Sequence, residues 1–329
     1  DFLGKKVLTV VIDTDGDQWE EGIDRSPEIR HEITSSPEDV FKRISESGIV
    51  GLGGAAFPTH VKLTPPEGMK PEYLILNGAE CEPYLTADYR LMLEHGQEIL
   101  LGGELMRRTL GAGVNGIIGI EANKPRAIEL MRELTSKSLQ WKVVPLKKRY
   151  PQGGEKQLID AVLGRRVASF ALPVSTGAIV QNVSTAYAVY EAVQKNKPLI
   201  SKVLTVSSSD SSIQKNYRFR VGTPIMDILS HAGAMEKDGG LSPQFAKVVN
   251  GGPMMGKPVS NLEGPVMKST SGLLLFTEKE TKRKEPGECI RCAKCFEACP
   301  MRLQPYLLYQ LALAGRTEEL EEHRVFDCI

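Results

Sequence analysis

The sequence lacks long apolar runs and has no excess of charge of either sign. Its longest uninterrupted apolar stretches, such as Leu273–Phe276, are far shorter than the roughly 20 residues of a membrane-spanning helix. Lysine and arginine together number 41, as do aspartate and glutamate, so no basic field attracts a nucleic-acid backbone. We therefore expect no nucleic-acid partner, and we expect any membrane attachment to come through partner proteins or other segments.

Cysteine is scarce, with six residues in 329, and nothing resembles a secretion signal, which argues against a disulfide-stapled scaffold. Four of the six fall in one run, which is closed by Pro300: Cys289, Cys292, Cys295 and Cys299. Two gaps of two residues, then a gap of three and a proline, are the bacterial-type spacing for [4Fe-4S] clusters. In that pattern three thiolates hold one cluster and the fourth reaches a second. We expect the chain to carry electrons singly.

Zinc and a redox dithiol are the alternatives for this run. Zinc ribbons usually split their ligands into two distant pairs, whereas here three cysteines lie within seven residues, so the cluster is favoured. Near the end of the sequence, Cys328-Ile329 repeats the opening Cys289-Ile290. A complete second run starting at Cys328 would finish both clusters. We therefore expect the chain to be a fragment of a protein with two [4Fe-4S] clusters.

The first part of the chain predicts an α/β domain with a parallel sheet, ending near residue 198. Ser36 and Pro37 mark the start of a helix that Gly48 ends. Strands and helices then alternate. The predicted elements are strands at Tyr73–Leu76, Val114–Ile120 and Trp141–Leu146, and helices at Asp88–Leu110, Pro125–Leu134, Glu155–Leu163 and Thr185–Gln194. Before them, Lys5–Asp13 reads as a strand without a nearby partner.

The remainder predicts a small α+β module, a polar linker and a helical segment. The module has about eighty residues, a usual domain size. Its predicted strands are Lys202–Ser207, Tyr217–Val221, Lys247–Asn250 and Gly272–Thr277, with a helix that begins after Thr223-Pro224 and stops at Gly233. The linker spans residues 278–288, and Pro305–Ala314 and Thr317–Glu322 are predicted helices.

A glycine-rich loop at residues 51–59 precedes Lys62. Glycines allow backbone amides to approach an anion, and a lysine adds a compact positive charge for a phosphate. The loop is neither a Walker loop nor a Rossmann fingerprint, because it lacks Gly-Lys-Ser/Thr and no predicted strand leads into it. On spacing alone, a glycine-rich surface turn is at least as good an interpretation.

Two further turns carry polar residues. Asn77–Pro83 follows a predicted strand, and Glu80 and Glu82 there could bind ribose or ribityl hydroxyls, although a solvated acidic turn is the simpler interpretation. Cys81 reads as a small packing residue. Tyr150–Glu155 opens a helix, for which simple capping is the alternative.

Together these segments resemble one family, the C subunit of the Rnf electron-transport complex. The shared sequence motifs include Gly-Gly-Ala-Ala-Phe-Pro-Thr-His-Val-Lys-Leu, Asn-Gly-Ala-Glu-Cys-Glu-Pro-Tyr, Tyr-Pro-Gln-Gly-Gly-Glu-Lys-Gln-Leu, Asn-Gly-Gly-Pro-Met-Met-Gly and Cys-Pro-Met-Arg-Leu-Gln-Pro. The resemblance runs from about Lys5 onward. A more distant one is to the NADH-binding flavoprotein subunit of respiratory complex I, whose flavin loop reads Gly-Arg-Gly-Gly-Ala-Gly-Phe-Pro-Thr-Gly-Leu-Lys.

The distant resemblance implies a set of cofactor-binding residues. Those implied to face FMN are Gly51, Gly53, Gly54, Lys62, Asn77 and Glu80, with Glu82 facing the nicotinamide and Glu155 and Asn182 completing the pocket. The sequence departs from that pattern at Leu52, Ala79, Gly154 and Gln181. Flavin contacts at these four positions and the choice between NADH and NADPH therefore stay open.

The resemblance also implies the division of the chain. Residues 1–20 would be the remnant of an N-terminal barrel-sandwich domain, 21–198 an FMN/NADH-binding α/β domain, 199–277 a β-grasp module and 278–329 a truncated ferredoxin-type [4Fe-4S] domain. The implied cluster ligands are Cys289, Cys292, Cys295, Cys299 and Cys328. The expected fold class is thus α/β with a smaller α+β module and a mostly helical iron-sulfur domain.

The function implied is that of an NADH-dependent oxidoreductase subunit, which exchanges hydride between NAD(H) and FMN and passes single electrons to clusters. Its partners would be NADH, the other subunits of a bacterial membrane complex that moves ions, and ferredoxin indirectly. Its place would be the cytoplasmic face of the membrane. Two alternatives stay open: a soluble flavin and iron-sulfur enzyme similar to corrin reductases or to a proline-reductase-associated electron-transfer protein, and a cluster-bearing scaffold without flavin.

Overall fold

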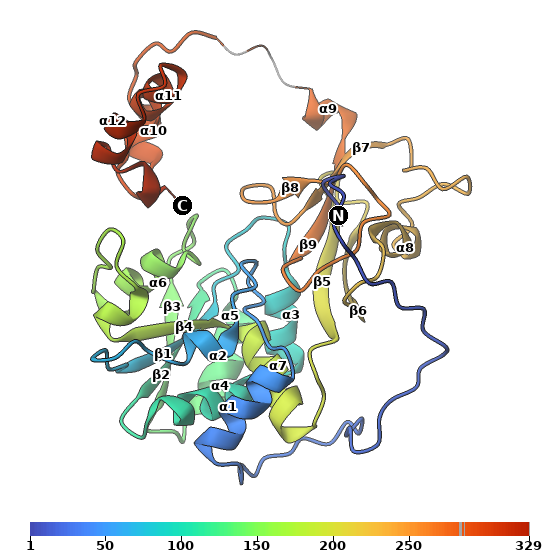
Figure 1. The fold of residues 1–329 in the computed structure, drawn as a ribbon, viewed down its shortest axis with the longest axis vertical. Helices are drawn as coiled ribbons and strands as arrows, with labels where there is room; N and C mark the ends of the chain where they lie inside the picture. The colour runs from blue at the N-terminus through green and yellow to red at the C-terminus, as the bar shows by residue number, and fades with distance from the viewer. Residues whose placement is uncertain (283–284, 286, 329) are drawn as a thin grey trace.

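The computed structural model describes residues 1–282, 285 and 287–328. Positions 283, 284, 286 and 329, which fall in the expected linker and cluster segment, lie outside the described residues. Figure 1 shows a parallel sheet surrounded by helices, a second sheet beside it, and a group of helices near the C-terminus. The chain is therefore built around two separate sheets.

The first sheet has four parallel strands in the order β3-β2-β1-β4. Its strands are β1 (Tyr73–Gly78), β2 (Asn115–Glu121), β3 (Trp141–Leu146) and β4 (Ala178–Asn182). Strands β2 and β3 extend the sheet to one side of β1, whereas β4 lies on the other side. Ligands of open α/β sheets bind where the order reverses in this way, beyond the carboxyl ends of the strands. The reversal falls between β1 and β4, whose final residues include the register pair Asn77 and Asn182.

Helices cover this sheet, so its central strands β1 and β2 are largely buried, whereas the edge strand β3 exposes Lys142 and Pro145. The helices are α1 (Pro37–Glu46), α2 (Thr59–Lys62), α3 (Ala87–Glu94), α4 (Gly96–Leu110), α5 (Pro125–Thr135), α6 (Glu155–Leu163) and α7 (Val183–Gln194), with a 3-10 turn η1 (Pro173–Thr176). Helices α4 and α7 approach so closely that a Cβ on Gly102 would lie 1.8 Å from the carbonyl oxygen of Ala186. Glycine is therefore required at that crossing.

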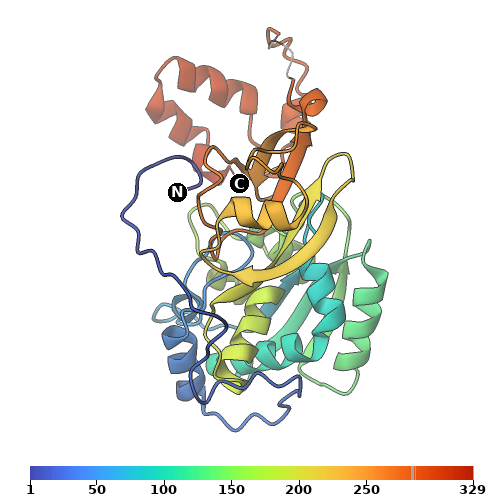
Figure 2. The same cartoon turned by 90° about the vertical axis from the view of Figure 1, so that its right-hand side faces the viewer.

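The second sheet has five strands in the order β6-β5-β9-β7-β8 and is mixed. Its elements are β5 (Ser201–Ser208), β6 (Gln214–Arg220), β7 (Phe245–Asn250), β8 (Lys257–Pro258) and β9 (Gly272–Thr277), with helix α8 (Ile225–His231). The helix packs its buried Ile225 and Leu229 into the same core as Leu204 and Leu273 of the sheet. Figure 2 shows this sheet standing over the helices of the first.

The C-terminal segment contains α9 (Glu278–Thr281), α10 (Lys294–Ala298), α11 (Pro305–Leu313), α12 (Thr317–Glu322) and a 3-10 turn η2 (Val325–Asp327). It contacts the α/β unit through Asp327, which accepts a hydrogen bond from Ser169 Oγ at 2.6 Å, and through Met301, whose Sδ lies 3.0 Å from Gln157 Nε2. Among the described residues, no helix combines the length and apolar character that crossing a bilayer demands.

The structure confirms the α/β class and most predicted elements; α6, α12, β3 and β9 have the predicted bounds. The predicted strand at Lys5–Asp13 is wrong: these residues are irregular, and Leu8, Val10 and Val11 are exposed. A strand needs a neighbour to take its backbone hydrogen bonds, and none lies beside this segment in the described chain. Strand β4 was missed, because its short apolar run follows Gly177 directly and leads at once into α7.

Candidate functional site

A cavity of about 130 Å³ opens at the carboxyl ends of β1 and β4, where the strand order reverses. The α/β unit contributes Gly53, Asn77, Glu80, Glu82 and Asn182 to its wall, all of them predicted site residues. The second sheet closes the other side with Lys202, Val203 and Ser271. Five residues from three separate sequence motifs therefore meet at one place.

The glycine-rich loop closes on itself above this cavity. The amide of Gly51 donates to the carbonyl of Phe57 at 2.8 Å, and the amide of Ala56 donates back to the carbonyl of Gly51 at 3.1 Å. A Cβ on Gly53 would lie 3.4 Å from Asn182 Nδ2, so the loop backbone is in contact with the end of β4. Gly54 has a φ of +118° and open space where a side chain would stand, so its backbone can approach a ligand directly.

Lys62, at the end of α2, pairs with Glu155 at the start of α6. Its Nζ lies 2.6 Å from Glu155 Oε1, and both side chains are partly exposed, at 29% and 35%. The loop and helix α6 are distant in sequence, and this ion pair joins them. Neither Lys62 nor Glu155 lines the cavity itself, so their place in the site stays a prediction.

Asn77 and Glu80 are held by different partners. Asn77 Nδ2 donates to the carbonyl of Gly153 at 2.9 Å, which brings the Tyr150–Glu155 turn against the end of β1. The Glu80 carboxylate accepts from the amides of Asp88 at 2.7 Å and Tyr89 at 3.1 Å, in the first turn of α3. Glu80 itself has a φ of +47°, a left-handed conformation that the surrounding contacts maintain.

The surroundings of Glu80 differ from those of a solvated acidic turn. Loss of solvation raises the pKa of Glu80 to about 8, the negative charge of Asp88 adds to that rise, and Lys124 opposes it. Lys124 Nζ donates to the carbonyl of Ala79 at 2.7 Å and so lies beneath the same turn. A carboxyl group whose pKa is displaced in a cavity is a common feature of functional sites.

Asn182 caps α7 and also contacts the opposite side of the crevice. Its Oδ1 accepts from the amide of Ser184 at 2.8 Å, and its Nδ2 donates to Asp88 Oδ2 at 2.7 Å. Ser184 Oγ donates to the other oxygen of Asp88. Asp88 therefore links α3 to α7 across the cavity.

Glu82 is bound by the second sheet's loop rather than by its own unit. Its carboxylate accepts from the amides of Met255 at 2.8 Å and Met254 at 3.1 Å. These amides lie in the Asn-Gly-Gly-Pro-Met-Met-Gly turn between β7 and β8. The segment that carries Met254 and Met255 is thus part of the site.

Reading the sequence missed several residues of this site: Asp88, Lys124, Ser184, Lys202 and the Met254 and Met255 amides. Asp88 was placed at a helix start, and its carboxylate there was the one available signal. Lys202 and the methionine amides come from the second sheet, and no local pattern links them to a crevice in the first. Their contribution depends on how the two sheets pack.

The five predicted cluster ligands lie apart from this cavity. Cys289, Cys292, Cys295 and Cys328 are exposed, and Cys299, which is half-buried, receives a hydrogen bond to Sγ from the amide of Leu303 at 3.4 Å. In the described part of the chain, no three histidine, cysteine or carboxylate side chains gather in a metal-binding arrangement. Arg291 and Ala293, in the gaps of the run, have φ of 55° and 60°, so the backbone turns between successive cysteines.

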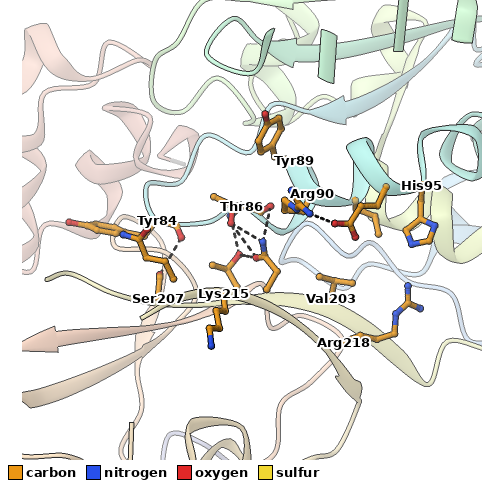
Figure 3. A pocket seen from close by; sticks show the side chains of 14 residues that line it. Tyr84, Thr86, Tyr89, Arg90, His95, Val203, Ser207, Lys215 and Arg218 are labelled. Carbon is orange, nitrogen blue, oxygen red and sulfur yellow. Dashed lines mark hydrogen bonds and ion pairs between the residues drawn. The ribbon is translucent and has the colours of Figure 1, made fainter. Parts of the chain in front are cut away.

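A second and larger cavity of about 750 Å³ lies between α3 and the antiparallel pair β5–β6 (Figure 3). Arg90 forms an ion pair with Glu94 on one wall, and Arg218 on the other donates to Tyr187 Oη at 3.0 Å. Figure 3 shows Thr86 on the side of α3 and Lys215 on the side of the strands. None of the predicted cofactor-binding residues lines it, so the candidate site is the smaller crevice.

A parallel sheet with a glycine-rich loop, amides and carboxylates at its switch point defines a nucleotide-type cofactor-binding unit. The comparisons agree: a family model described as "Nuo51 FMN-binding domain" matches residues 44–191. The chain is 43% identical to the C subunit of the proton-translocating ferredoxin:NAD(+) oxidoreductase complex of Clostridium ljungdahlii, over 98% of this chain and 68% of the relative. It is 38% identical to the C subunit of the Na(+)-translocating complex of Acetobacterium woodii, over 98% of this chain and 71% of that one.

A solved NAD+-reducing [NiFe]-hydrogenase shares the fold, with a TM-score of 0.57 at 20% identity over 74% of this chain and 47% of the other. At that identity the similarity concerns the fold alone. The two bacterial C subunits, by contrast, are similar over nearly the whole chain. The chain therefore belongs to the family of C subunits of ion-translocating ferredoxin:NAD(+) oxidoreductase complexes, the Rnf complexes.

Proposed function

We propose that this chain is the NADH-facing electron-transfer subunit of an ion-translocating ferredoxin:NAD oxidoreductase. As a family member it is an oxidoreductase subunit that works with other subunits of its complex. The one observation that carries the finer proposal is the meeting of Gly53, Asn77 and Asn182 at the switch point of the sheet. This crevice is where such sheets bind nucleotide cofactors.

The residues present suit FMN. Gly54 leaves space for a group to approach the loop backbone, and the ammonium of Lys62, in the helix α2 that follows the loop, suits a phosphate. Asn77, Glu80 and Asn182 supply hydrogen-bonding groups on the cavity wall, and Glu155 pairs with Lys62. FMN would supply hydride acceptance from NADH and release of electrons singly. The chain's residues would bind it, orient the nicotinamide at Glu82 and keep water out.

We propose that Cys289, Cys292, Cys295, Cys299 and Cys328 ligate [4Fe-4S] clusters. The donor set supports this: closely spaced thiols on a turning backbone, with an N–H···S hydrogen bond at Cys299, suit soft iron-sulfur ligation. The contacts of Asp327 and Met301 hold this segment against α6, next to the flavin unit.

We also propose the domain division given by the resemblance, with boundaries at residues 20, 198 and 277. The two separate cores of the sheets support the boundary near 198. We place the protein at the cytoplasmic face of the bacterial membrane, attached through its partner subunits.

The test is an anaerobic absorbance titration of the full-length protein with NADH, after iron, sulfide and flavin analysis. Bleaching of flavin absorbance followed by loss of the broad cluster absorbance is the expected result. Clusters without flavin and without any response to NADH would favour a cluster-bearing scaffold instead. Copurification with integral membrane subunits separates the proposal from a soluble reductase.

A further inference from the structure

We propose that Lys202 of β5, a strand of the second sheet, supplies a positive charge to the flavin site. This charge would stabilise the negative charge of reduced FMN. This inference rests on the proposed function. Lys202 lines the same cavity as Asn77, Glu80 and Asn182, and its residue is only 6% exposed. Among the described residues that line the cavity, it is the cationic side chain.

The contacts of Lys202 leave its charge without a close counter-ion. Within the described chain, its Nζ has one hydrogen-bond acceptor, the carbonyl oxygen of Lys268 at 2.8 Å. An ammonium has three N–H donors, so two remain for a group in the cavity. A buried charge is costly unless a partner of opposite charge meets it.

The carboxylates that share the cavity are already engaged. Asp88 accepts a hydrogen bond from Asn182 on one carboxylate oxygen and from Ser184 on the other. Glu80 accepts hydrogen bonds from two backbone amides, and Glu82 accepts hydrogen bonds from two others. The arrangement suits a ligand that brings its own negative charge to Lys202.

The protonation of Lys202 agrees with this role. Burial lowers the pKa of Lys202 to about 8, and the charge of Asp88 opposes part of that fall. Glu80, Cys81 and Glu82 also face the cavity. A negative charge that arrives beside the amine favours its protonated form and so opposes the effect of burial.

The measurable consequence is the midpoint potential of bound FMN. A nearby cation binds the reduced form more tightly than the oxidised form, so it raises the potential. Lys202→Gln keeps a donor for the carbonyl of Lys268 and removes the charge. We expect a negative shift of at least about 30 mV, which is a tenfold change in the ratio of the two affinities for a two-electron couple.

The experiment is a spectroelectrochemical titration of the full-length protein and its variants, with FMN content and thermal melting measured in parallel. Lys202→Arg should restore most of the wild-type potential. Lys268→Met is the matched control: it removes a neighbouring lysine that donates to the carbonyl of Gly48 and leaves the backbone acceptor of Lys202 in place. Its potential should stay at the wild-type value.

Each other outcome overturns the inference in a distinct way. Lys202→Gln that retains FMN at the wild-type potential shows that Lys202 is only a link between the sheets. An equal shift in Lys268→Met shows a general effect of surface charge. If Lys202→Gln releases FMN, its affinities for oxidised and reduced FMN are measured directly, and equal losses contradict the proposal. A wild-type protein that binds no FMN overturns the proposed function itself.

Discussion

Lys62 Nζ lies 2.6 Å from Glu155 Oε1 and joins the end of the glycine-rich loop to the start of α6. The two residues are 93 positions apart in sequence. This pair sets the position of the cation that the proposed phosphate site requires, so it is the natural place to begin testing the site.

Lys62→Met should weaken FMN binding by roughly 10- to 100-fold, because a hydrogen bond to a charged group contributes about 1.5–3 kcal/mol. Quenching of FMN fluorescence on addition of the apoprotein measures the affinity. Lys70→Met removes the same charge from an exposed position away from the site and should bind FMN as the wild type does. Equal affinity in both variants would exclude Lys62 from the site.

Glu80 predicts a specific dependence of stability on pH. Its pKa is raised to about 8, whereas a carboxyl in the unfolded chain titrates near about 4.3. Between these two pKa values Glu80 is protonated in the folded protein and ionised in the unfolded chain. The stability that this proton confers is therefore fully present below the unfolded-state pKa and is lost as the pH rises to about 8. Glu80→Gln does not titrate, and its melting temperature should therefore fall less than that of the wild type between about pH 5.5 and pH 8.

Thermal melting followed by circular dichroism at several pH values checks this prediction. The pKa of Lys202 is lowered to about 8, so the titration of Lys202 changes the melting temperature only above about that pH. Wild-type and Glu80→Gln curves that run parallel through neutral pH would show that the Glu80 carboxylate is ionised throughout.

Loss of the Glu82 carboxylate should expose backbone amides in the loop between β7 and β8 to exchange with solvent. Glu82→Ala removes the acceptor of the Met254 and Met255 amides, which are otherwise exposed. Their amide hydrogens should exchange at least about tenfold faster, as expected if at least about 1.4 kcal/mol of protection is lost. Hydrogen exchange followed by mass spectrometry measures this. The amide of Gly256, which donates to the carbonyl of Gly252, serves as the internal control and should be unchanged.

Gly102→Ala should destabilise the α/β unit by at least about 1–3 kcal/mol, because α4 and α7 have to separate to admit the methyl group. Gly113→Ala is the control, since a Cβ there meets no atom within 4 Å. Urea unfolding of both variants provides the comparison. Equal midpoints would show that the crossing of α4 and α7 is looser than the structure indicates.

Cys299→Ser should lower the iron and acid-labile sulfide content of the full-length protein, since its thiolate is proposed as a cluster ligand. Cys81→Ser is the matched control, because Cys81 lines the cavity beside Gly153 and is far from the cysteine run in sequence. Iron analysis and electron paramagnetic resonance of the reduced protein measure the clusters. Loss of iron in both variants, or in neither, would contradict the assignment.

The sequence alone determined the alternation of strands and helices, the motifs of the site and the family. The positions of strands and helices are indicated by local signals, because caps and periodicity act within a few residues. These signals are apolar runs of strand length, the helix start at Ser36 and Pro37, and glycines at the ends of elements. They located β1, β3, α6 and most other elements. The same locality explains the failure at Lys5–Asp13, since a strand-like run forms a strand only where a partner lies beside it.

Only the tertiary structure decided which side chains meet. Strand order brings Asn77 beside Asn182, and packing of the second sheet brings Lys202 and the amides of Met254 and Met255 to the same crevice. The raised pKa of Glu80 likewise arises from burial and from the charge of Asp88 on α3, and no motif encodes it. Sequence patterns record what each segment prefers, whereas charge, burial and proximity across the site depend on how distant segments pack.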